Sequence, residues 1–538
     1  MSTSRLPNTV YYTNHSELPG RSGDVENSIV PDEDNDYRDG DSTKRNSIVE
    51  PPGSGSRQIV VDKTDTEKQS RGQQGFLVSW DGPDDPDNPL NFPARVKCTI
   101  VLLTGAVTFC VSFASSVFST ATAATALEFH VSEEVMILGV SLYVFGFALG
   151  PLIWGPMSER YGRCRPISIG FSLFIIFQIP VAVAQNLETI FLCRFFGGVF
   201  GAAPLAIVSS SYVDFLSMVD RGVAMSVFAA AVFLGPVLGP IVGSFLTESY
   251  LGWRWTAWIT MIMSAFFGVL YLVFVPETYA PILLQRRAQV KRHATKEWAW
   301  HSTLDETPTT FTTLYNKYLS KPFRMMYYEP VLDVLVAYGA LVYSILYVIF
   351  FAYPYSFQKT RGWSPGIASL PFLGLMVGVI SACIYMAVDT KTRFQRALKR
   401  DGKLVPEQRL PPMIVGSVVL PIGLFWFAWT SSPKITWVPQ VISGVFIGMG
   451  MTTVFFNGVL YLVDVYLQSA PSALAANTFV RSASAAGFPL FSTYMYQRLG
   501  VAWATSLLGF LCIAMLPFPI IFWFYGAKMR SKGNFTIS

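Results

Sequence analysis

The chain has 538 residues, of which 51% are hydrophobic, 15% aromatic and only 14% charged, and its mean hydropathy is +0.39. Soluble domains carry about 25% charged residues, and most of the charge here lies in the first 95 residues and two loops. A soluble globular fold is therefore excluded. The net charge of +5 does not indicate nucleic-acid binding, because the cations lie beside apolar segments.

Residues 1–95 are polar and rich in Ser, Asp, Asn, Pro and Gly, and they lack the apolar core of a signal peptide. We expect them to form a disordered cytoplasmic tail. The tail closes with WDGPDDPDNPLNFPAR, in which the Asp-Pro and Asn-Pro steps favour turns.

Apolar runs of about 20 residues, long enough to cross a bilayer, follow this tail. They predict an all-α membrane protein with twelve spans in two six-helix repeats. The domains expected are the tail at 1–95, an N-terminal half at 96–275, a cytoplasmic central loop at 276–330, a C-terminal half at 331–526 and a short cytoplasmic tail at 527–538. The expected spans are 98–120, 135–157, 165–184, 188–213, 223–247, 254–275, 331–353, 366–388, 411–429, 436–463, 472–495 and 501–526.

The loops give the orientation. From Arg95 onward, twenty-four Lys and Arg residues lie on the side that carries both termini, against five on the other side. Because cytoplasmic loops carry the excess of Lys and Arg, both termini are expected in the cytoplasm.

The third and fourth spans align with the ninth and tenth almost without a gap. Gly170 falls on Gly416, and Gly198-Val199-Phe200 falls on Gly444-Val445-Phe446. This spacing predicts that the two halves are parallel repeats.

The fifth span contains FLGPVLGPIVGS, with Gly235, Gly239 and Gly243 on one helix face and Pro236 and Pro240 on the adjacent face. Glycines at a spacing of four allow a neighbouring helix to approach closely, and prolines bend a helix. Two interpretations stay open: tight packing alone, or a bent helix at which the two halves move.

The six cysteines and four histidines form no cluster or paired motif, so we expect no disulfide framework and no metal site. There is no nucleophile constellation and no G-x-x-x-x-G-K-[ST] sequence. We therefore expect a protein that is not an enzyme and that needs neither ATP nor a cofactor.

GPVLGPIVG resembles the antiporter signature of drug:proton exporters in the major facilitator superfamily. GPMSERYGRCR (155–165) resembles the loop motif of that superfamily, with Glu159 where Asp is usual and Cys164 where a basic residue is common, and RFFGGVFGAA (194–203) resembles its Arg-plus-glycine motif. From about Trp80 to the C-terminus, the chain resembles the fungal twelve-span branch.

The resemblance implies the major facilitator fold and a secondary exporter of amphipathic toxic compounds, either antifungal drugs or a secreted fungal metabolite, by proton antiport with alternating access. It implies a monomer in the fungal plasma membrane, or alternatively the vacuolar membrane, whose partners are a small molecule, protons and lipid. A polyamine or organic-cation exporter and a transporter-like sensor remain as alternatives.

Several charged residues are candidates for coupling. The resemblance implies that Glu159 meets the N-terminus of the eleventh span in one state and that Arg194 takes part in proton coupling, while Arg160 and Arg163 complete the loop motif. Arg481 lies deep in the eleventh span and is expected to pair either with Asp464 or with backbone carbonyls. The carboxylates lie at span ends rather than mid-membrane, so the proton carrier is not identified.

Aromatic and amide side chains are the candidates for substrate binding, because pockets for apolar ligands combine aromatic walls with a few polar groups. The scarcity of membrane carboxylates favours neutral or weakly charged apolar compounds over polyamines. The candidates are Tyr343, Tyr347, Phe351, Asn457, Tyr461 and Asn477.

Overall fold

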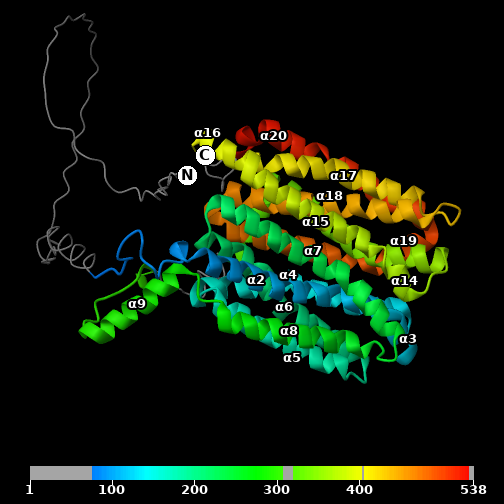
Figure 1. Cartoon of the computed structure of the whole chain (residues 1–538), viewed down its shortest axis with the longest axis horizontal. Coiled ribbons are helices and arrows are strands. Elements are labelled where there is room, and N and C mark those ends of the chain that lie inside the picture. Colours follow the sequence, from blue (N-terminus) through cyan, green and yellow to red (C-terminus); the bar gives the residue numbers. More distant parts are fainter. Residues whose placement is uncertain (1–75, 307–318, 403–404, 532–538) are drawn as a thin grey trace, which may run out of the picture. The chain divides into compact units, whose positions relative to one another are not determined.

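The computed structural model describes residues 76–306, 319–402 and 405–531, and these are almost entirely helical (Figure 1). Most of the expected tail lies outside the described residues. Eleven helical segments are long and apolar enough to cross a membrane, and the last of them, Ala470–Arg530, has 61 residues. That is well over twice the roughly 20 residues that one crossing needs. Gly500 interrupts this segment with φ +69° and ψ +169°, so it contains two spans and confirms the predicted twelve.

The N-terminal half contains six long helices and one short one. The chain enters α2 and leaves α4 at one end of the bundle, which we call the proximal end; the other end is the distal end. The helices are α2 (Ala94–Val117), α3 (Thr122–Glu128), α4 (Glu133–Tyr161), α5 (Cys164–Ala182), α6 (Leu187–Phe215), α7 (Met218–Glu248) and α8 (Arg254–Phe274).

The C-terminal half repeats this arrangement, and α20 ends at the proximal end, the end at which α16 also lies (Figure 1). Its helices are α13 (Pro330–Pro354), α14 (Pro365–Ser369), α15 (Phe372–Asp389), α16 (Gln395–Asp401), α17 (Leu410–Trp429), α18 (Trp437–Tyr466), α19 (Ala470–Met515) and α20 (Pro517–Arg530).

The aligned glycines occupy equivalent places in the two halves, as the internal repeat predicts. Gly170 of α5 packs on α6, where an added Cβ would lie 3.0 Å from the Phe200 carbonyl oxygen, and Gly416 of α17 packs on α18 at 3.1 Å from the Gly450 oxygen. In the same way, Gly198 joins α6 to α4 and Gly444 joins α18 to α15. The shared sequence spacing therefore reflects shared close contacts between helices.

The glycine face of α7 contacts α2 within the same half. A Cβ added at Gly235 would lie 2.7 Å from the Phe113 nitrogen, and Gly239 and Gly243 meet the following turns of α2. The tight packing that the glycine spacing predicts is therefore present, and it lies within the N-terminal half rather than between the halves. Movement of the halves at this helix stays a prediction. α7 is a continuous helix through Pro236 and Pro240.

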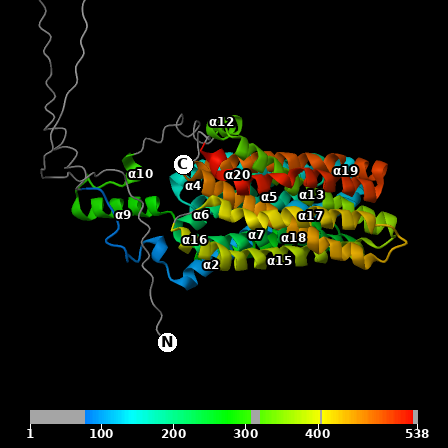
Figure 2. The same cartoon turned by 90° about the horizontal axis from the view of Figure 1, so that it is seen from above.

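The last part of the expected tail is ordered, contrary to its assignment as disordered. Val78 donates its backbone N–H to the His301 oxygen at 2.9 Å, and Asp85 accepts from the Arg287 Nη1 at 2.7 Å. Arg287 also pairs with Asp81. These contacts tie residues 76–91 to the central loop at the proximal end (Figure 2). The central loop contains α9 (Ala280–Thr295), α10 (Thr303–Glu306) and α12 (Lys321–Tyr328).

Candidate functional site

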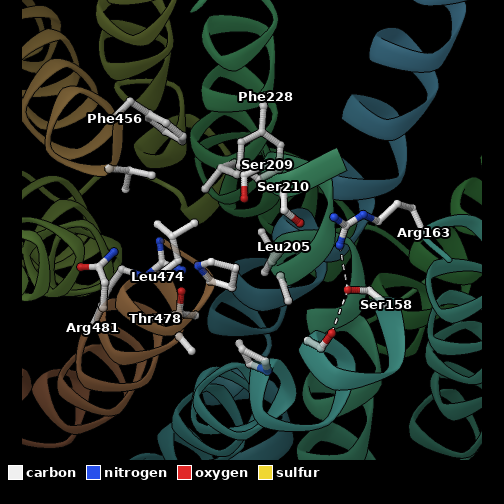
Figure 3. A pocket seen from close by; sticks show the side chains of 18 of the residues that line it. Ser158, Arg163, Leu205, Ser209, Ser210, Phe228, Phe456, Leu474, Thr478 and Arg481 are labelled. Carbon is white, nitrogen blue, oxygen red and sulfur yellow. Dashed lines mark hydrogen bonds between the residues drawn. The ribbon is translucent and has the colours of Figure 1, made fainter. Parts of the chain in front are cut away.

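A cavity lies between the two halves, with walls from α4, α6 and α7 on one side and α18 and α19 on the other (Figure 3). It is narrow, since the centre of a water molecule can reach about 80 Å³ of it, whereas ligand pockets are usually about 300–1,000 Å³. The lining residues are Pro151, Gly155, Ser158, Glu159, Arg163, Leu205, Ala206, Ser209, Ser210, Phe228, Val232, Phe455, Phe456, Val459, Pro471, Leu474, Ala475, Asn477, Thr478 and Arg481.

Arg481 is the basic residue deep in this cavity. Pro471 lies in the first turn of α19, and Arg481 follows it by ten residues. Because an α-helix rises about 1.5 Å per residue, Arg481 lies about 15 Å deeper in the bundle than Pro471. Its side chain is 7% exposed, and its guanidinium lies over the Tyr343 ring at 4.6 Å and the Phe455 ring at 4.8 Å. Among the described residues, Nε has no hydrogen-bond partner. The cation is therefore held by aromatic faces and is available to a further partner.

Asp464, the alternative partner expected for Arg481, lies elsewhere. It is 2% exposed, and its Oδ1 accepts from Arg221 Nη2 at 3.1 Å while its Oδ2 accepts from Arg409 Nε at 2.9 Å. Pairing of Asp464 with Arg481 is thus contradicted. From the sequence, Arg221 and Arg409 are recognised only as two of the basic residues in the loops. A buried aspartate at a span end needs a cation, but the sequence does not say which of many cations supplies it.

Hydroxyl groups connect the surroundings of Arg481, in the C-terminal half, to α2 in the N-terminal half. Tyr343 lies beneath Arg481, and its hydroxyl is 3.4 Å from that of Tyr347, one turn further along α13. Tyr347 in turn donates to the Ser115 Oγ on α2 at 3.0 Å. The polar contacts next to Arg481 therefore cross from the C-terminal to the N-terminal half.

Arg194 is also buried, but its guanidinium is satisfied. Its Nε donates to the Gly139 oxygen at 2.8 Å and its Nη2 to the Ala114 oxygen at 3.2 Å, and it lies over the rings of Phe118 and Tyr143. It thereby braces α2, α4 and α6 within one half. It faces the bundle interior, as the cost of an arginine in lipid requires.

The substrate-binding candidates are distributed unevenly. Asn477 lines the cavity, and Tyr343 supports Arg481 from below. Tyr347, Phe351, Asn457 and Tyr461 are not among the lining residues. The Asn457 Nδ2 donates to its own helix at Thr453, and the Tyr461 ring lies 6.3 Å from that of Phe522 in α20, so neither is placed to contact a ligand here.

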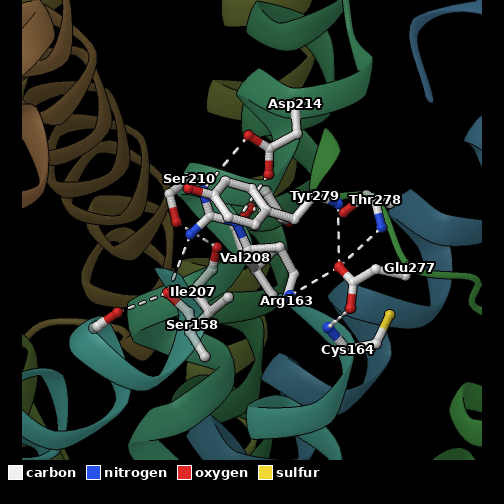
Figure 4. Close-up of polar contacts among 12 residues, drawn as sticks. Ser158, Arg163, Cys164, Ile207, Val208, Ser210, Asp214, Glu277, Thr278 and Tyr279 are labelled. Atoms are coloured by element: carbon white, nitrogen blue, oxygen red, sulfur yellow. Dashed lines mark hydrogen bonds and ion pairs between the residues drawn. The ribbon is translucent and has the colours of Figure 1, made fainter. Parts of the chain in front are cut away.

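The loop motif forms a proximal network around Arg163 and Glu277 (Figure 4). The Arg163 Nε donates to Asp214 at 2.8 Å, while the Glu277 carboxylate accepts four backbone N–H groups, from 163, 164, 278 and 279. Burial lowers the pKa of Arg163, but the Asp214 carboxylate outweighs it, so the pKa is raised overall. Gly162 has φ +90°, and a Cβ there would meet the Glu277 carboxylate, so the motif requires glycine at that position.

The neighbouring motif residues face two different spaces. Glu159 lines the main cavity together with Pro471 of α19. The approach of this carboxylate to the N-terminus of the eleventh span in one state stays a prediction. Arg160 is exposed and faces a separate proximal groove beside Arg165 and Arg286.

The two halves contact each other at both ends of the bundle. Arg221 of α7 meets Asp464 of α18 at the proximal end, and the Gly366 N–H at the start of α14 donates to Glu248 Oε2 at 2.9 Å at the distal end. The cavity therefore lies between two sets of contacts, each of which would have to open for a ligand to cross.

The chain is similar to a known family of proteins. Residues 104–489 match the family model described as Major Facilitator Superfamily. The chain is 55% identical over 462 residues to the citrinin biosynthesis cluster MFS transporter of Monascus ruber, covering 86% of this chain and 92% of that one. It is 49% identical to the ascochitine biosynthesis cluster MFS transporter of Didymella fabae, covering 92% and 93%, and 43% identical to the cercosporin MFS transporter of Cercospora nicotianae, covering 85% and 90%.

Among solved structures, the chain is similar to an MFS proton:xylose symporter bound to 6-bromo-6-deoxy-D-glucose. The TM-score is 0.59 at 15% identity, and the match covers 81% of this chain and 96% of that one. At this identity the likeness shows the shared fold.

Proposed function

This chain belongs to the Major Facilitator Superfamily, and we propose that it is a secondary active exporter of an amphipathic fungal metabolite or toxin. The observation that carries the proposal is a cavity walled by both halves and bounded at each end by contacts between them. The relatives named for the biosynthesis clusters of citrinin and ascochitine support a secreted metabolite as substrate. The excess of basic residues at the proximal end supports a cytoplasmic location of that end. We propose the plasma membrane as the site of the protein.

Transport would proceed by alternating access. Opening of the proximal contacts, among them Arg221–Asp464, would admit substrate from the cytoplasm, and opening of the distal Glu248–Gly366 contact would release it. A cavity open to water over only about 80 Å³ must widen for this, which favours a rocking movement of whole halves over a rearrangement of single side chains.

Proton antiport is the coupling we propose, with Glu159 as the carboxylate best placed to take part. Glu159 is the acidic residue that lines the cavity, at its proximal end. A carboxylate exposed to the cavity can bind a proton in one state and a helix N-terminus in another, since N-termini favour negative charge. Arg194, which braces three helices, would position the N-terminal half in this cycle.

A polyamine or organic-cation substrate is disfavoured by the same lining. A polycation in a dry cavity needs several carboxylates, whereas this cavity offers Glu159 at its proximal end and Arg481 at its deep end.

The test is efflux of a labelled panel of apolar drugs, aromatic metabolites and spermidine from a pump-deficient yeast that expresses the chain, with and without a protonophore. We expect efflux of apolar or aromatic compounds, lost with the protonophore and in Glu159→Gln, and kept in Glu188→Gln, whose carboxylate is exposed at the distal end of α6. Efflux of spermidine alone, or of nothing despite surface expression, would contradict the proposal.

A further inference from the structure

We propose that the substrate is an organic anion, an apolar and usually aromatic body that carries a carboxylate or comparable oxygen anion, and that Arg481 binds the anionic group. This inference rests on the proposed exporter function and names its substrate class. It replaces the neutral or weakly charged compounds that the sequence favours. The residues that carry it are Arg481 and the apolar wall that faces it.

The first step is the unfilled bonding capacity of Arg481. A guanidinium has five N–H donors in a fixed fork that matches a carboxylate. In the described part of the chain, Arg481 forms no ion pair, and its buried Nε has no acceptor. A buried donor without a partner is costly. We therefore interpret the Arg481 Nε in the cavity wall as a donor for a ligand that binds and dissociates.

The second step is the contrast with the other buried arginines. Arg194 donates to two carbonyls, Arg163 pairs with Asp214, and Asp464 serves Arg221 and Arg409 together. Each of these has at least one acceptor built into the fold, although among the described residues Arg221 Nε and Arg409 Nη2 have no partner of their own. Arg481 instead has the faces of Tyr343 and Phe455, which attract a cation without occupying its hydrogen-bond donors. The rings thus hold the guanidinium without competing with an anion for its N–H groups.

The other residues of the cavity wall also suit an anion with an apolar body. Phe228, Phe456 and Leu474 present apolar surface to the same cavity, and Ser209, Ser210, Asn477 and Thr478 add neutral polar groups. The acidic Glu159, near the C-terminal end of α4, lies at the opposite, proximal end of the lining. An anion bound at Arg481 with its apolar body toward the phenylalanines fits this distribution, whereas a cation would meet a like charge at the deep end.

The experiment measures binding to the purified full chain in lipid nanodiscs by thermal stabilisation. The probes are one-, two- and three-ring aromatic carboxylic acids, each beside its methyl ester and its aminomethyl analogue. Stabilisation by a ligand reports its affinity for the native state. We compare the unsubstituted chain with Arg481→Gln, Arg481→Lys and Arg498→Gln, the last an exposed arginine of the same helix.

We expect acids to bind more tightly than their esters and amines, with a loss of at least about tenfold in Arg481→Gln, because a charged hydrogen bond is removed. Arg481→Lys should keep part of the preference for acids, and Arg498→Gln should keep all of it. Esters or amines that bind as tightly as acids would overturn the inference, even if Arg481→Gln does not fold. So would acid binding that survives Arg481→Gln.

The yeast efflux assay separates the two proposals. Efflux of apolar compounds without binding of any acid would overturn the anion inference and leave the exporter function in place. Absence of both efflux and binding would contradict the exporter function, and the anion inference with it.

Discussion

Arg221 Nη2 lies 3.1 Å from Asp464 Oδ1 and so joins α7 of the N-terminal half to α18 of the C-terminal half. Arg409 holds the second oxygen of the same carboxylate from within the C-terminal half. The Asp464 side chain has no exposed surface, so these three residues form a buried contact across the interface that alternating access must break.

The first prediction follows from the different roles of Asp464, Arg221 and Arg409 in this contact. Asp464→Asn leaves two buried arginines without a counter-charge, which costs about 3–5 kcal/mol when a buried pair is broken. Arg221→Gln leaves Asp464 paired with Arg409 and should cost clearly less. The check is the unfolding temperature of the purified variants in detergent; equal losses for the two substitutions would contradict the shared-carboxylate arrangement.

The second prediction concerns the glycine face of α7. Gly235→Leu places side-chain atoms against the α2 backbone, where even a Cβ would lie 2.7 Å from the Phe113 nitrogen. Overpacking of this kind costs about 1–3 kcal/mol or more, so we expect export to be abolished while membrane insertion is kept. The control is Gly487→Ala in α19, where no atom lies within 4 Å of an added Cβ. Full export by a well-expressed Gly235→Leu variant would refute the packing account.

The third prediction concerns the turn of the loop motif. Gly162→Ala puts a Cβ against the Glu277 carboxylate, on a backbone with φ +90°. Such backbone strain costs about 1–3 kcal/mol for a residue other than glycine, and the clash adds to it. Gly252→Ala has φ +70° and open space around it, so it isolates the backbone cost. Gly162→Ala should unfold at a lower temperature than Gly252→Ala. The reverse order would contradict the close contact between position 162 and the Glu277 carboxylate.

The fourth prediction is a pH dependence at the contact between the tail and the central loop. The hydrogen bond from Arg287 lowers the pKa of Asp85 from 3.8 to about 2. A carboxyl group whose folded pKa is depressed contributes stability that is present above its unfolded pKa and is lost as pH falls through the folded value. Residues 76–91 should therefore stay protected from pH 7 down to about 4 and loosen below it.

Hydrogen exchange followed by mass spectrometry, corrected for intrinsic rates, measures this protection. Asp85→Asn should loosen the segment at pH 7, and Asp84→Asn, at an exposed neighbouring side chain, should not. Loosening of the unsubstituted chain already between pH 5 and 6 would argue against the Asp85–Arg287 contact as its cause.

The positions of the spans could be predicted because span length, loop charge and apolar composition are local properties of the sequence. Twelve spans and the repeat are confirmed. The direction in which each helix faces could not be predicted in the same way. Tyr461 and Asn457 lie on a helix that is apolar nearly all round, so no periodicity distinguishes the cavity side from the side against α20.

Pairings between distant residues were the other limit. Asp464 was one of the two partners expected for Arg481, the other being backbone carbonyls, but the fold brings Arg221 to Asp464 from 243 residues away. Asp85 and Arg287 likewise meet across 202 residues. The polar composition of residues 1–95 predicted disorder, although Asp85 in that range accepts the hydrogen bonds from Asp81, Asp87 and Arg287 that order the segment.

Alternating access is tested most directly by paired distance measurements with spin labels, after replacement of the six free cysteines. One pair, Arg165→Cys with Arg396→Cys, reports the proximal end; the other, Tyr250→Cys with Lys359→Cys, reports the distal end, and all four sites are exposed. In an Asp464→Asn background, which weakens the proximal contact, the proximal distance should lengthen while the distal distance shortens. Distances that do not change, or that lengthen at both ends together, would contradict a transporter whose halves rock about a central cavity.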